Sequence, residues 1–182
     1  MAQQPRTDAP SHGDAPDDRI QAAWNALTHV PDPEIPVVSV VELGMIAAIR
    51  AIDDTLVVDL TPTFAACPAL DHIRLHIADA LASIGESDAT VNIVFDPPWT
   101  TDRITPTGRD KLQRFGIAPP RRDGRQRARP TEGSVLATLE AVPCPNCNAT
   151  DTELESIFGP TLCRSIHYCR RCLQSFEHFK NV

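Results

Sequence analysis

The stretch "LVVDLTPTFAACPALDHIRLHIADALASIGESDATVNIVF", residues 56–95, decides the fold. Its first residues alternate between apolar and polar and predict a strand with one buried face, and Val91, Ile93 and Phe95 predict a second strand. Between them, apolar residues at helical spacing predict a helix that ends at Gly85: Leu70, Ile73, Ile77, Leu81 and Ile84. A strand, a helix and a strand in this order predict a right-handed parallel crossover.

A β-hairpin is predicted immediately before this stretch. Residues 43–61 contain two apolar runs, and Asp53 and Asp54 between them are suitable turn residues. Further upstream, apolar residues at helical spacing predict a helix over residues 17–30. This helix should stop there because three prolines follow within a few residues.

A short helix is predicted after the crossover. Thr105 is suited to its N-cap and Pro106 to its first turn. Leu112 and Phe115 should face inward, and Gly116 should close the helix. The chain is therefore expected to be an α+β protein that begins with a small two-layer α/β sandwich around a three-stranded mixed sheet.

Composition places further bounds on the chain of 182 residues. Residues 1–16 lack periodicity and predict a disordered tail, so the first domain is expected over residues 17–119. No apolar run approaches the roughly 18 residues of a membrane helix, and the N-terminus does not resemble a signal peptide. These features predict a cytoplasmic protein without a membrane partner. The net charge of -7 argues against general affinity for nucleic acid.

Residues 120–134 predict an Arg- and Pro-rich linker. Five arginines lie between Arg121 and Arg129, and no aliphatic core residue accompanies them. Such a segment is either a solvated linker or a docking strip for an acidic partner or nucleic acid. The following "SVLATLEAV" fits a strand or a short helix equally well.

Two Cys-x-x-Cys pairs, separated by 21 residues, predict a metal site in a second domain at residues 135–182. Two such turns complete a tetrahedron of sulfurs, and a module this small needs metal to fold. We expect zinc as a structural ion, with mononuclear iron or an iron–sulfur cluster as alternatives. The expected ligands are Cys144, Cys147, Cys169 and Cys172. The small core around them is expected from Phe158, Ile166, Tyr168, Phe176 and Phe179.

Cys163 is a fifth cysteine in this domain. It is interpreted as a buried apolar residue, as an accessory thiol, or as a ligand if the site holds a cluster. His167 and His178 are interpreted as ordinary polar residues, because four thiolates already saturate zinc.

Cys67 lies alone in the first domain. Pro68 suits the first position of the following helix, which would place Cys67 at or near the N-cap and lower the pKa of its thiol. The alternative is a buried structural cysteine. The neighbouring loop carries Asp32 and Glu34, either as a polar helix exit or as a carboxylate pair that assists a metal near Cys67. His72 and His76 are expected on a solvated helix face.

Several segments resemble a known family. "DPEIPVVSVVELGMI", "TPTFAACPALDHI" and "VFDPPWTTDRIT" are similar to the metal–sulfur cluster assembly domain, which is associated with iron–sulfur protein maturation. "TGRDKLQRFGIAPP", followed by the segment with the four-cysteine motif, is similar to the PaaD family of bacterial phenylacetyl-CoA epoxidases. The resemblance covers residues 18–182. The cysteine loop departs from the pattern at Ala65 and Ala66, where a small residue followed by glycine is expected.

The resemblance implies a non-catalytic accessory subunit that helps assemble iron–sulfur or di-iron centres during phenylacetate catabolism. The implied partners are the iron–sulfur, flavin-containing reductase subunit and the di-iron oxygenase subunit. By position, a transient iron or cluster site would comprise Asp32, Glu34, Thr63 and Cys67. One thiol cannot saturate a metal within one chain, so a client or a second copy in a homodimer would complete the shell.

Two other functions compete with this hypothesis. A nucleic-acid-binding or general protein-docking zinc ribbon would use the arginine run as its grip. A thiol oxidoreductase would need a second cysteine near Cys67, a glycine-rich cofactor loop or a histidine base, and the sequence suggests none of them.

Overall fold

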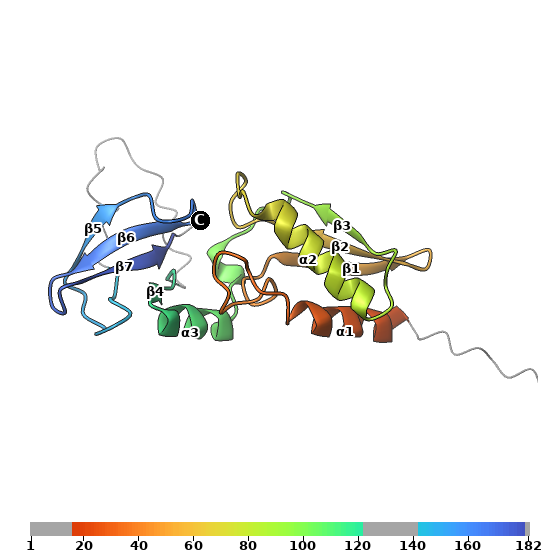
Figure 1. The fold of residues 1–182 in the computed structure, drawn as a ribbon, viewed down its shortest axis with the longest axis horizontal. Helices are drawn as coiled ribbons and strands as arrows, with labels where there is room; N and C mark the ends of the chain where they lie inside the picture. The colour runs from red at the N-terminus through yellow and green to blue at the C-terminus, as the bar shows by residue number, and fades with distance from the viewer. Residues whose placement is uncertain (1–15, 122–141, 181–182) are drawn as a thin grey trace, which may run out of the picture.

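The computed structural model describes residues 16–121 and 142–180, which form two lobes (Figure 1). Residues 1–15 of the predicted tail, nearly all of the arginine-rich segment and most of "SVLATLEAV" lie outside these residues, whereas Pro16 begins α1. One lobe holds α1, α2 and the sheet β1–β3, and the other holds β4–β7 (Figure 1). Within the described ranges, no helix has the length and apolar character needed to cross a membrane.

The first lobe contains the predicted three-stranded mixed sheet. Its strands are β1 (Ile46–Ile52), β2 (Thr55–Leu60) and β3 (Thr90–Ile93), in the order β1-β2-β3. β1 and β2 are antiparallel, whereas β2 and β3 are parallel and joined through a helix. Asp53 and Asp54 both have positive φ, 45° and 64°, as a two-residue hairpin turn of type I′ requires.

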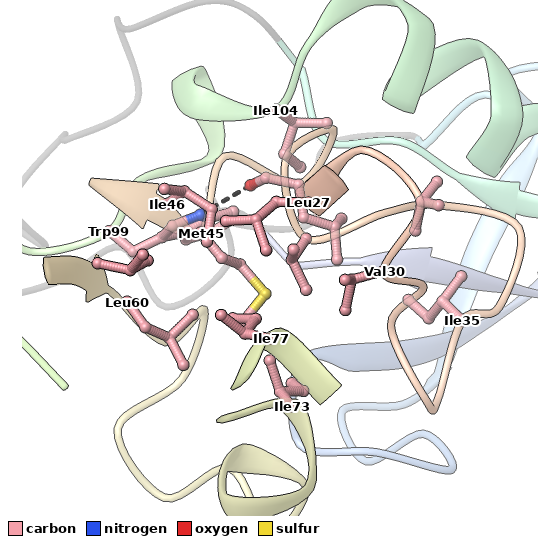
Figure 2. Close-up of a cluster of buried hydrophobic side chains, with 14 of the residues drawn as sticks. Leu27, Val30, Ile35, Met45, Ile46, Leu60, Ile73, Ile77, Trp99 and Ile104 are labelled. Atoms are coloured by element: carbon pink, nitrogen blue, oxygen red, sulfur yellow. Dashed lines mark hydrogen bonds between the residues drawn. The ribbon is translucent and has the colours of Figure 1, made fainter. Parts of the chain in front are cut away.

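Two helices form the second layer of this lobe. α1 (Pro16–Leu27) contacts α2 (Leu70–Ser83), and they pack against β1 and β3 respectively. In the predicted stripe of α2, Ile73, Ile77 and Leu81 are fully buried in the core, and Figure 2 shows the first two. Leu70 is half-buried, and the inward position of Ile84 is wrong, because this side chain follows the end of the helix and is 40% exposed. The indole Nε1 of Trp99 donates a hydrogen bond of 2.9 Å to the Leu43 carbonyl within this core (Figure 2). The predicted two-layer α+β architecture is confirmed.

A 3-10 turn at Thr101–Arg103 leads into α3 (Pro106–Phe115), which begins and ends as predicted. The Thr105 hydroxyl accepts a hydrogen bond of 3.0 Å from the Gly108 amide, and Gly116 has a φ of 92°. The inward position of Phe115 is wrong, because this side chain is 51% exposed. The chain turns at Gly116, and Ile117 occupies the buried position instead.

The second lobe contains a four-stranded sheet in the order β4-β7-β6-β5. Its strands are β4 (Ile117–Ala118), β5 (Thr152–Ser156), β6 (Arg164–Cys169) and β7 (Gln174–Phe179). β4 pairs with β7 in parallel, with Ile117 opposite Glu177 and Ala118 opposite His178. β4 lies in the segment assigned by sequence to the first domain, so the two predicted domains share a sheet.

The lobes also share a hydrophobic core. Phe179 is 1% exposed and belongs to the same buried cluster as Leu27 and Ile77, with its ring centroid 5.9 Å from that of Trp99. Its assignment to a separate ribbon core is therefore wrong. So is that of Phe158, which is 67% exposed. The end of β7 is buried by the first lobe, which a pattern internal to the ribbon cannot reveal.

Candidate functional site

The four predicted metal ligands converge in the second lobe. One ligand atom from each residue lies within 4.8 Å of all the others: Cys144, Cys147, Cys169 and Cys172. The Sγ atoms of Cys144 and Cys172 are 3.7 Å apart, and those of Cys147 and Cys169 are 3.5 Å apart. Four sulfurs at about 2.3 Å from a central ion would be separated by about 3.8 Å, so the arrangement fits a tetrahedral metal ion.

The backbone of the second Cys-x-x-Cys turn supports the sulfur of Cys169. Amides of Cys172 and Arg171 donate to the Cys169 sulfur and lower the pKa of that thiol to about 7. Asn148 and Leu173 directly follow the two turns, and both have positive φ, 60° and 59°. The equivalent conformation after each pair shows that the two turns are built alike.

The pKa of the Cys172 thiol is shifted in the opposite direction. Desolvation and the three surrounding cysteines raise its pKa to about 12. Four sulfurs crowded together resist carrying negative charge unless a cation neutralises them. This chemistry, together with the spacing, fits a bound metal ion of thiolate-favouring type.

Cys67 lies in the loop between β2 and α2, near the N-cap as predicted, but Pro68 does not occupy the first helical position. The helix begins at Leu70, its N-cap is Ala69, and no side chain caps it. Cys67 occupies the preceding turn, where its amide donates to the Phe64 carbonyl at 3.1 Å. Ala66 does not adopt positive φ, so its replacement of the expected glycine causes no backbone strain of that kind.

The environment of Cys67 raises the pKa of its thiol instead of lowering it. Burial is the main cause, and the nearby Glu34, Asp32 and Cys163 act in the same direction, against a hydrogen bond from the Ala69 amide. The expectation of a thiolate stabilised by the helix terminus is therefore wrong. The loop turns Cys67 toward acidic groups, and burial together with these groups outweighs the backbone amide.

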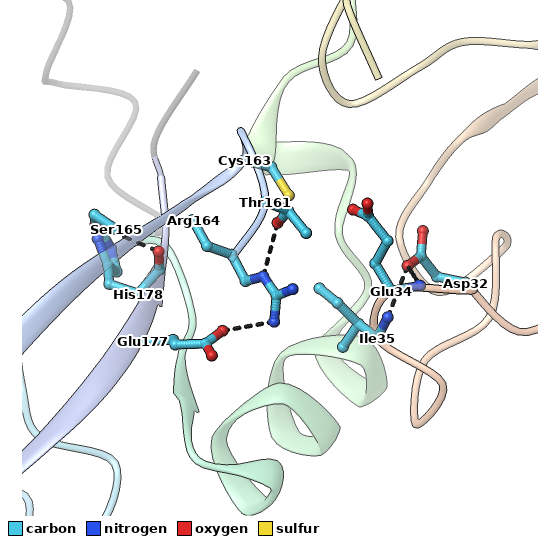
Figure 3. Close-up of polar contacts among 9 residues, drawn as sticks. All are labelled: Asp32, Glu34, Ile35, Thr161, Cys163, Arg164, Ser165, Glu177 and His178. Atoms are coloured by element: carbon cyan, nitrogen blue, oxygen red, sulfur yellow. Dashed lines mark hydrogen bonds and ion pairs between the residues drawn. The ribbon is translucent and has the colours of Figure 1, made fainter. Parts of the chain in front are cut away.

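Asp32 and Glu34 have different roles in the acidic loop. The buried Asp32 accepts hydrogen bonds from the amides of Glu34 and Ile35, at 2.9 and 2.8 Å, and so shapes the loop (Figure 3). Glu34 is half-buried, and its carboxylate lies on the side of Cys163 (Figure 3). Burial and the charge of Asp32 raise the pKa of Glu34, whereas Arg164 opposes this shift.

The second lobe contributes Cys163 and Arg164 to the same neighbourhood (Figure 3). The Cys163 Sγ lies 3.1 Å from the Thr161 hydroxyl. The buried guanidinium of Arg164 pairs with Glu177 at 2.5 Å and donates to the Thr161 hydroxyl at 2.8 Å. Sequence reasoning missed Arg164, because only the docking of the two lobes brings it near the acidic loop.

The predicted residues therefore separate into two groups. The acidic loop, Cys67 and Cys163 form one electrostatic neighbourhood, which we call the junction site: Asp32, Glu34, Cys67 and Cys163. The ligand atoms of these residues are not all within 4.8 Å of one another. In residues 16–121 and 142–180, only the four cysteines of the two Cys-x-x-Cys turns, which we call the knuckle cysteines, lie that close together. Thr63 is half-buried in the Cys67 loop and makes no side-chain hydrogen bond with the described residues. His72 is exposed, as expected, and His76 half-buried beside it.

Two family models match the chain. The "Iron-sulfur cluster assembly protein" model matches residues 20–93, and the "PaaD zinc beta ribbon domain" model matches residues 128–180. The first model covers most of α1, all of α2 and the sheet β1–β3, and the second covers β5–β7 with all four cysteines of the Cys-x-x-Cys pairs.

The chain is also similar to named proteins. It is 35% identical to an Escherichia coli (strain K12) protein assigned as the PaaD subunit of 1,2-phenylacetyl-CoA epoxidase, over 90% of this chain and 94% of that protein. It is 37% identical to the Fe-S protein maturation auxiliary factor YitW of Bacillus subtilis (strain 168), over 44% of this chain and 79% of that protein. It is likewise 37% identical to the factor SufT of Staphylococcus aureus (strain USA300), over 41% and 85%.

Two solved structures match about half of this chain. A domain of unknown function, DUF59, from Bacillus anthracis has a TM-score of 0.49 and 26% identity, over 53% of this chain and 92% of that chain. A conserved hypothetical protein from Thermotoga maritima has a TM-score of 0.44 and 34% identity, over 50% and 91%.

Proposed function

Because the chain belongs to the PaaD family of 1,2-phenylacetyl-CoA epoxidase subunits, we propose that it is a non-catalytic accessory subunit of such an epoxidase. Its similarity to auxiliary factors of Fe-S protein maturation supports an accessory role in iron–sulfur assembly. The proposed clients are the iron–sulfur reductase subunit and the di-iron oxygenase subunit of the complex, and the proposed setting is phenylacetate catabolism in the cytoplasm.

The observation that best supports this accessory role is the position of Cys67 in the junction site. Its thiol is half-buried, lies near two carboxylates and has a pKa above the ordinary value for cysteine. A metal must displace the proton of such a thiol, so binding at neutral pH is weaker than at a pre-formed thiolate. Weak binding suits iron or a cluster that is held briefly as cargo and then handed to a client.

The four-cysteine site has a different proposed role. We propose that it holds zinc permanently, because four sulfurs at this spacing complete a closed tetrahedral shell with no open position for a substrate. A bound metal would neutralise the sulfurs and stabilise the second lobe. Since this lobe supplies Cys163 and Arg164, a folded ribbon would also hold one side of the junction site in place.

The test of the carrier role is Cys67→Ser, co-expressed with the reductase and oxygenase subunits under anaerobic conditions. We expect the iron content of one or both clients, and their activity, to fall several-fold relative to wild type. Ala66→Ser is the matched control, because it adds the same hydroxyl to the same exposed turn and keeps the thiol. Clients with full iron content and activity in the presence of Cys67→Ser would refute the proposal.

We propose separately that the protein forms a homodimer. A homodimer would bring a second copy of Cys67 to a shared metal, as the resemblance to the cluster assembly family implies. Sedimentation of the purified protein with and without iron tests this directly. A monomer under both conditions would leave completion of the shell to the chain itself or to a client.

A further inference from the structure

Helix α2 carries two histidines side by side on its outer surface. His72 and His76 are four positions apart, and their ring centroids lie 4.1 Å apart with the ring planes tilted by 59°. His72 is exposed and His76 is half-buried. Neither ring forms a hydrogen bond or an ion pair with the part of the chain that the structure describes. The nitrogens of these two residues, which we call the histidine pair, are therefore available to an external ligand.

The buried side of α2 fixes the position of the histidine pair. Ile73 and Ile77 each directly follow one of the two histidines, and both are fully buried in the core of the first lobe. Successive residues are rotated by about 100° around a helix, so the histidines lie on the flank beside the buried face. The core thus holds the helix backbone in place, and only the two side chains have to rotate when a ligand binds.

The charged residues of α2 are arranged in favour of a cation. Arg74, the single basic residue of the helix, pairs with Asp71 at 3.7 Å. It lies about 160° around the helix from both histidines, so its charge points away from them. Asp79 is exposed and follows His76 by three positions, a spacing that makes the two side chains neighbours on the helix surface. A bound cation would therefore have a carboxylate near it.

We propose that the histidine pair is a binding site for a borderline divalent cation such as Zn²⁺ or Ni²⁺, with one nitrogen from each imidazole as a ligand. Imidazole is a preferred ligand of both ions, and histidines at i and i+4 on a helix bind one zinc ion in known metal motifs. This inference goes beyond the proposed function, because neither the junction site nor the four-cysteine site uses these residues.

The geometry of the pair suits chelation. Two nitrogens at about 2.1 Å from one ion are about 3.4 Å apart in a tetrahedral arrangement. Rings whose centroids are 4.1 Å apart reach this separation by small rotations of the side chains. The protein supplies two ligands, and the other positions are open to water or to a carboxylate. The ion should consequently exchange with solution, in contrast to an ion enclosed by the four knuckle cysteines.

The test is a calorimetric titration of the zinc-loaded full chain with Ni²⁺ at about pH 7.5, where imidazole is mostly neutral. Zinc already occupies the knuckle cysteines in this protein, so the titration reports the remaining ligands. Wild type should bind one Ni²⁺ in addition to its zinc. His72→Gln and His76→Gln should each weaken this binding at least tenfold. His29→Gln, at an exposed histidine just after α1, is the matched control and should bind as wild type does.

A variant with an unchanged number of histidines tests the spacing itself. Arg74→His combined with His76→Gln leaves two histidines that are two positions apart and point to opposite sides of the helix. We expect this double variant to bind Ni²⁺ as weakly as His76→Gln alone. Nickel-free variants should keep the thermal unfolding midpoint of wild type, which would exclude misfolding as the cause. Wild-type affinity in the double variant or in His76→Gln would overturn the proposal.

A second measurement on wild type requires no substitution. Paramagnetic Ni²⁺ should broaden the imidazole proton signals of His72 and His76 in the NMR spectrum of the zinc-loaded protein, and leave that of His29 sharp. No uptake of Ni²⁺ beyond the zinc, or broadening at His29 without broadening at the pair, would refute the site.

The histidine pair is also separable from the cysteine loop. Cys67→Ser should bind Ni²⁺ with the affinity of wild type, because its thiol is not a ligand of this site. Loss of Ni²⁺ binding in Cys67→Ser, together with retention in His76→Gln, would assign the ion to the cysteine loop and refute the histidine site.

Discussion

His178 has no evident function in the sequence, yet its burial is expected to make the stability of the folded protein depend on pH. It is 8% exposed on β7, and its ring centroid lies 5.3 Å from that of His167. Burial lowers the pKa of His178 to about 4, with smaller contributions from His167 and Arg121. His167 is also buried, and desolvation lowers the pKa of that ring too. Both side chains are therefore neutral components of the packing between strands.

We predict that acid destabilises the protein through His178. Between pH 6.5, the ordinary pKa of histidine, and about pH 4, His178 is protonated in the unfolded chain but neutral in the folded chain. The free energy of unfolding should therefore be fully retained above pH 6.5 and fall as the pH decreases toward 4, by about 3 kcal/mol from this one group.

Urea denaturation of wild type and His178→Asn at several pH values tests this expectation. The difference in free energy of unfolding between the two proteins should shrink as the pH falls from 6.5 to 4. His72→Asn, at an exposed position on α2, is the control and should run parallel to wild type. A constant difference between His178→Asn and wild type would show that His178 does not titrate in this range.

At the scale of elements, the two Cys-x-x-Cys turns organise the ribbon. The small core next to them contains only a few apolar residues besides the cysteines: Ala118, Val142, Ala149 and Phe176. So little buried apolar surface cannot offset the conformational entropy of three strands. The turns at the ends of β6 and before β5 therefore need a metal to remain folded.

Removal of the metal should unfold the ribbon. With a strong chelator, or in Cys147→Ser, we expect the amides of β5–β7 to lose protection from hydrogen exchange, because apparent zinc-binding energies are about 10–16 kcal/mol. The helix α2, which has its own fully buried residues, should keep more of its protection. Cys163→Ser is the matched control and should retain one zinc and a protected ribbon. Protected β5–β7 amides in metal-free protein would contradict the prediction.

At the scale of the whole molecule, Phe179 joins the lobes. Its side chain is fully buried beside Trp99 in the first core, although it belongs to the last strand of the second lobe. β4 adds a backbone connection, because it follows α3 directly and pairs with β7. The two lobes are consequently expected to unfold as one cooperative unit when the ribbon holds its metal.

Phe179→Ala tests this coupling in the zinc-loaded protein. Removing a fully buried phenylalanine should cost about 3–5 kcal/mol, whereas Phe158→Ala at an exposed position should change stability by less than about 0.5 kcal/mol. Fluorescence of the tryptophans in the first lobe and hydrogen exchange in β5–β7 should report the same unfolding midpoint in each protein. Separate midpoints in wild type, or loss confined to the second lobe in Phe179→Ala, would show that the lobes are independent.

Much of the fold follows from local patterns in the sequence. The helical stripe of α2, the turn at Asp53 and Asp54, and the cap at Thr105 are predicted correctly because each depends on residues that are close in sequence. The convergence within each Cys-x-x-Cys pair is local for the same reason. The sequence also resembles a cluster assembly family and the PaaD family, in agreement with the family models that match residues 20–93 and 128–180.

Tertiary structure decided the rest, because burial and electrostatics depend on residues that are distant in sequence. Phe179 packs in the first lobe and not in the ribbon core, and Ile117 takes the buried place expected for Phe115. The helix after Cys67 predicts a lowered pKa, yet burial and carboxylates from another loop raise it. Cys163 gains its neighbours only where the lobes dock. The sequence by itself thus determined the helices and the three-stranded sheet of the first lobe and the two Cys-x-x-Cys turns, and only their packing determined which thiols and charges face one another.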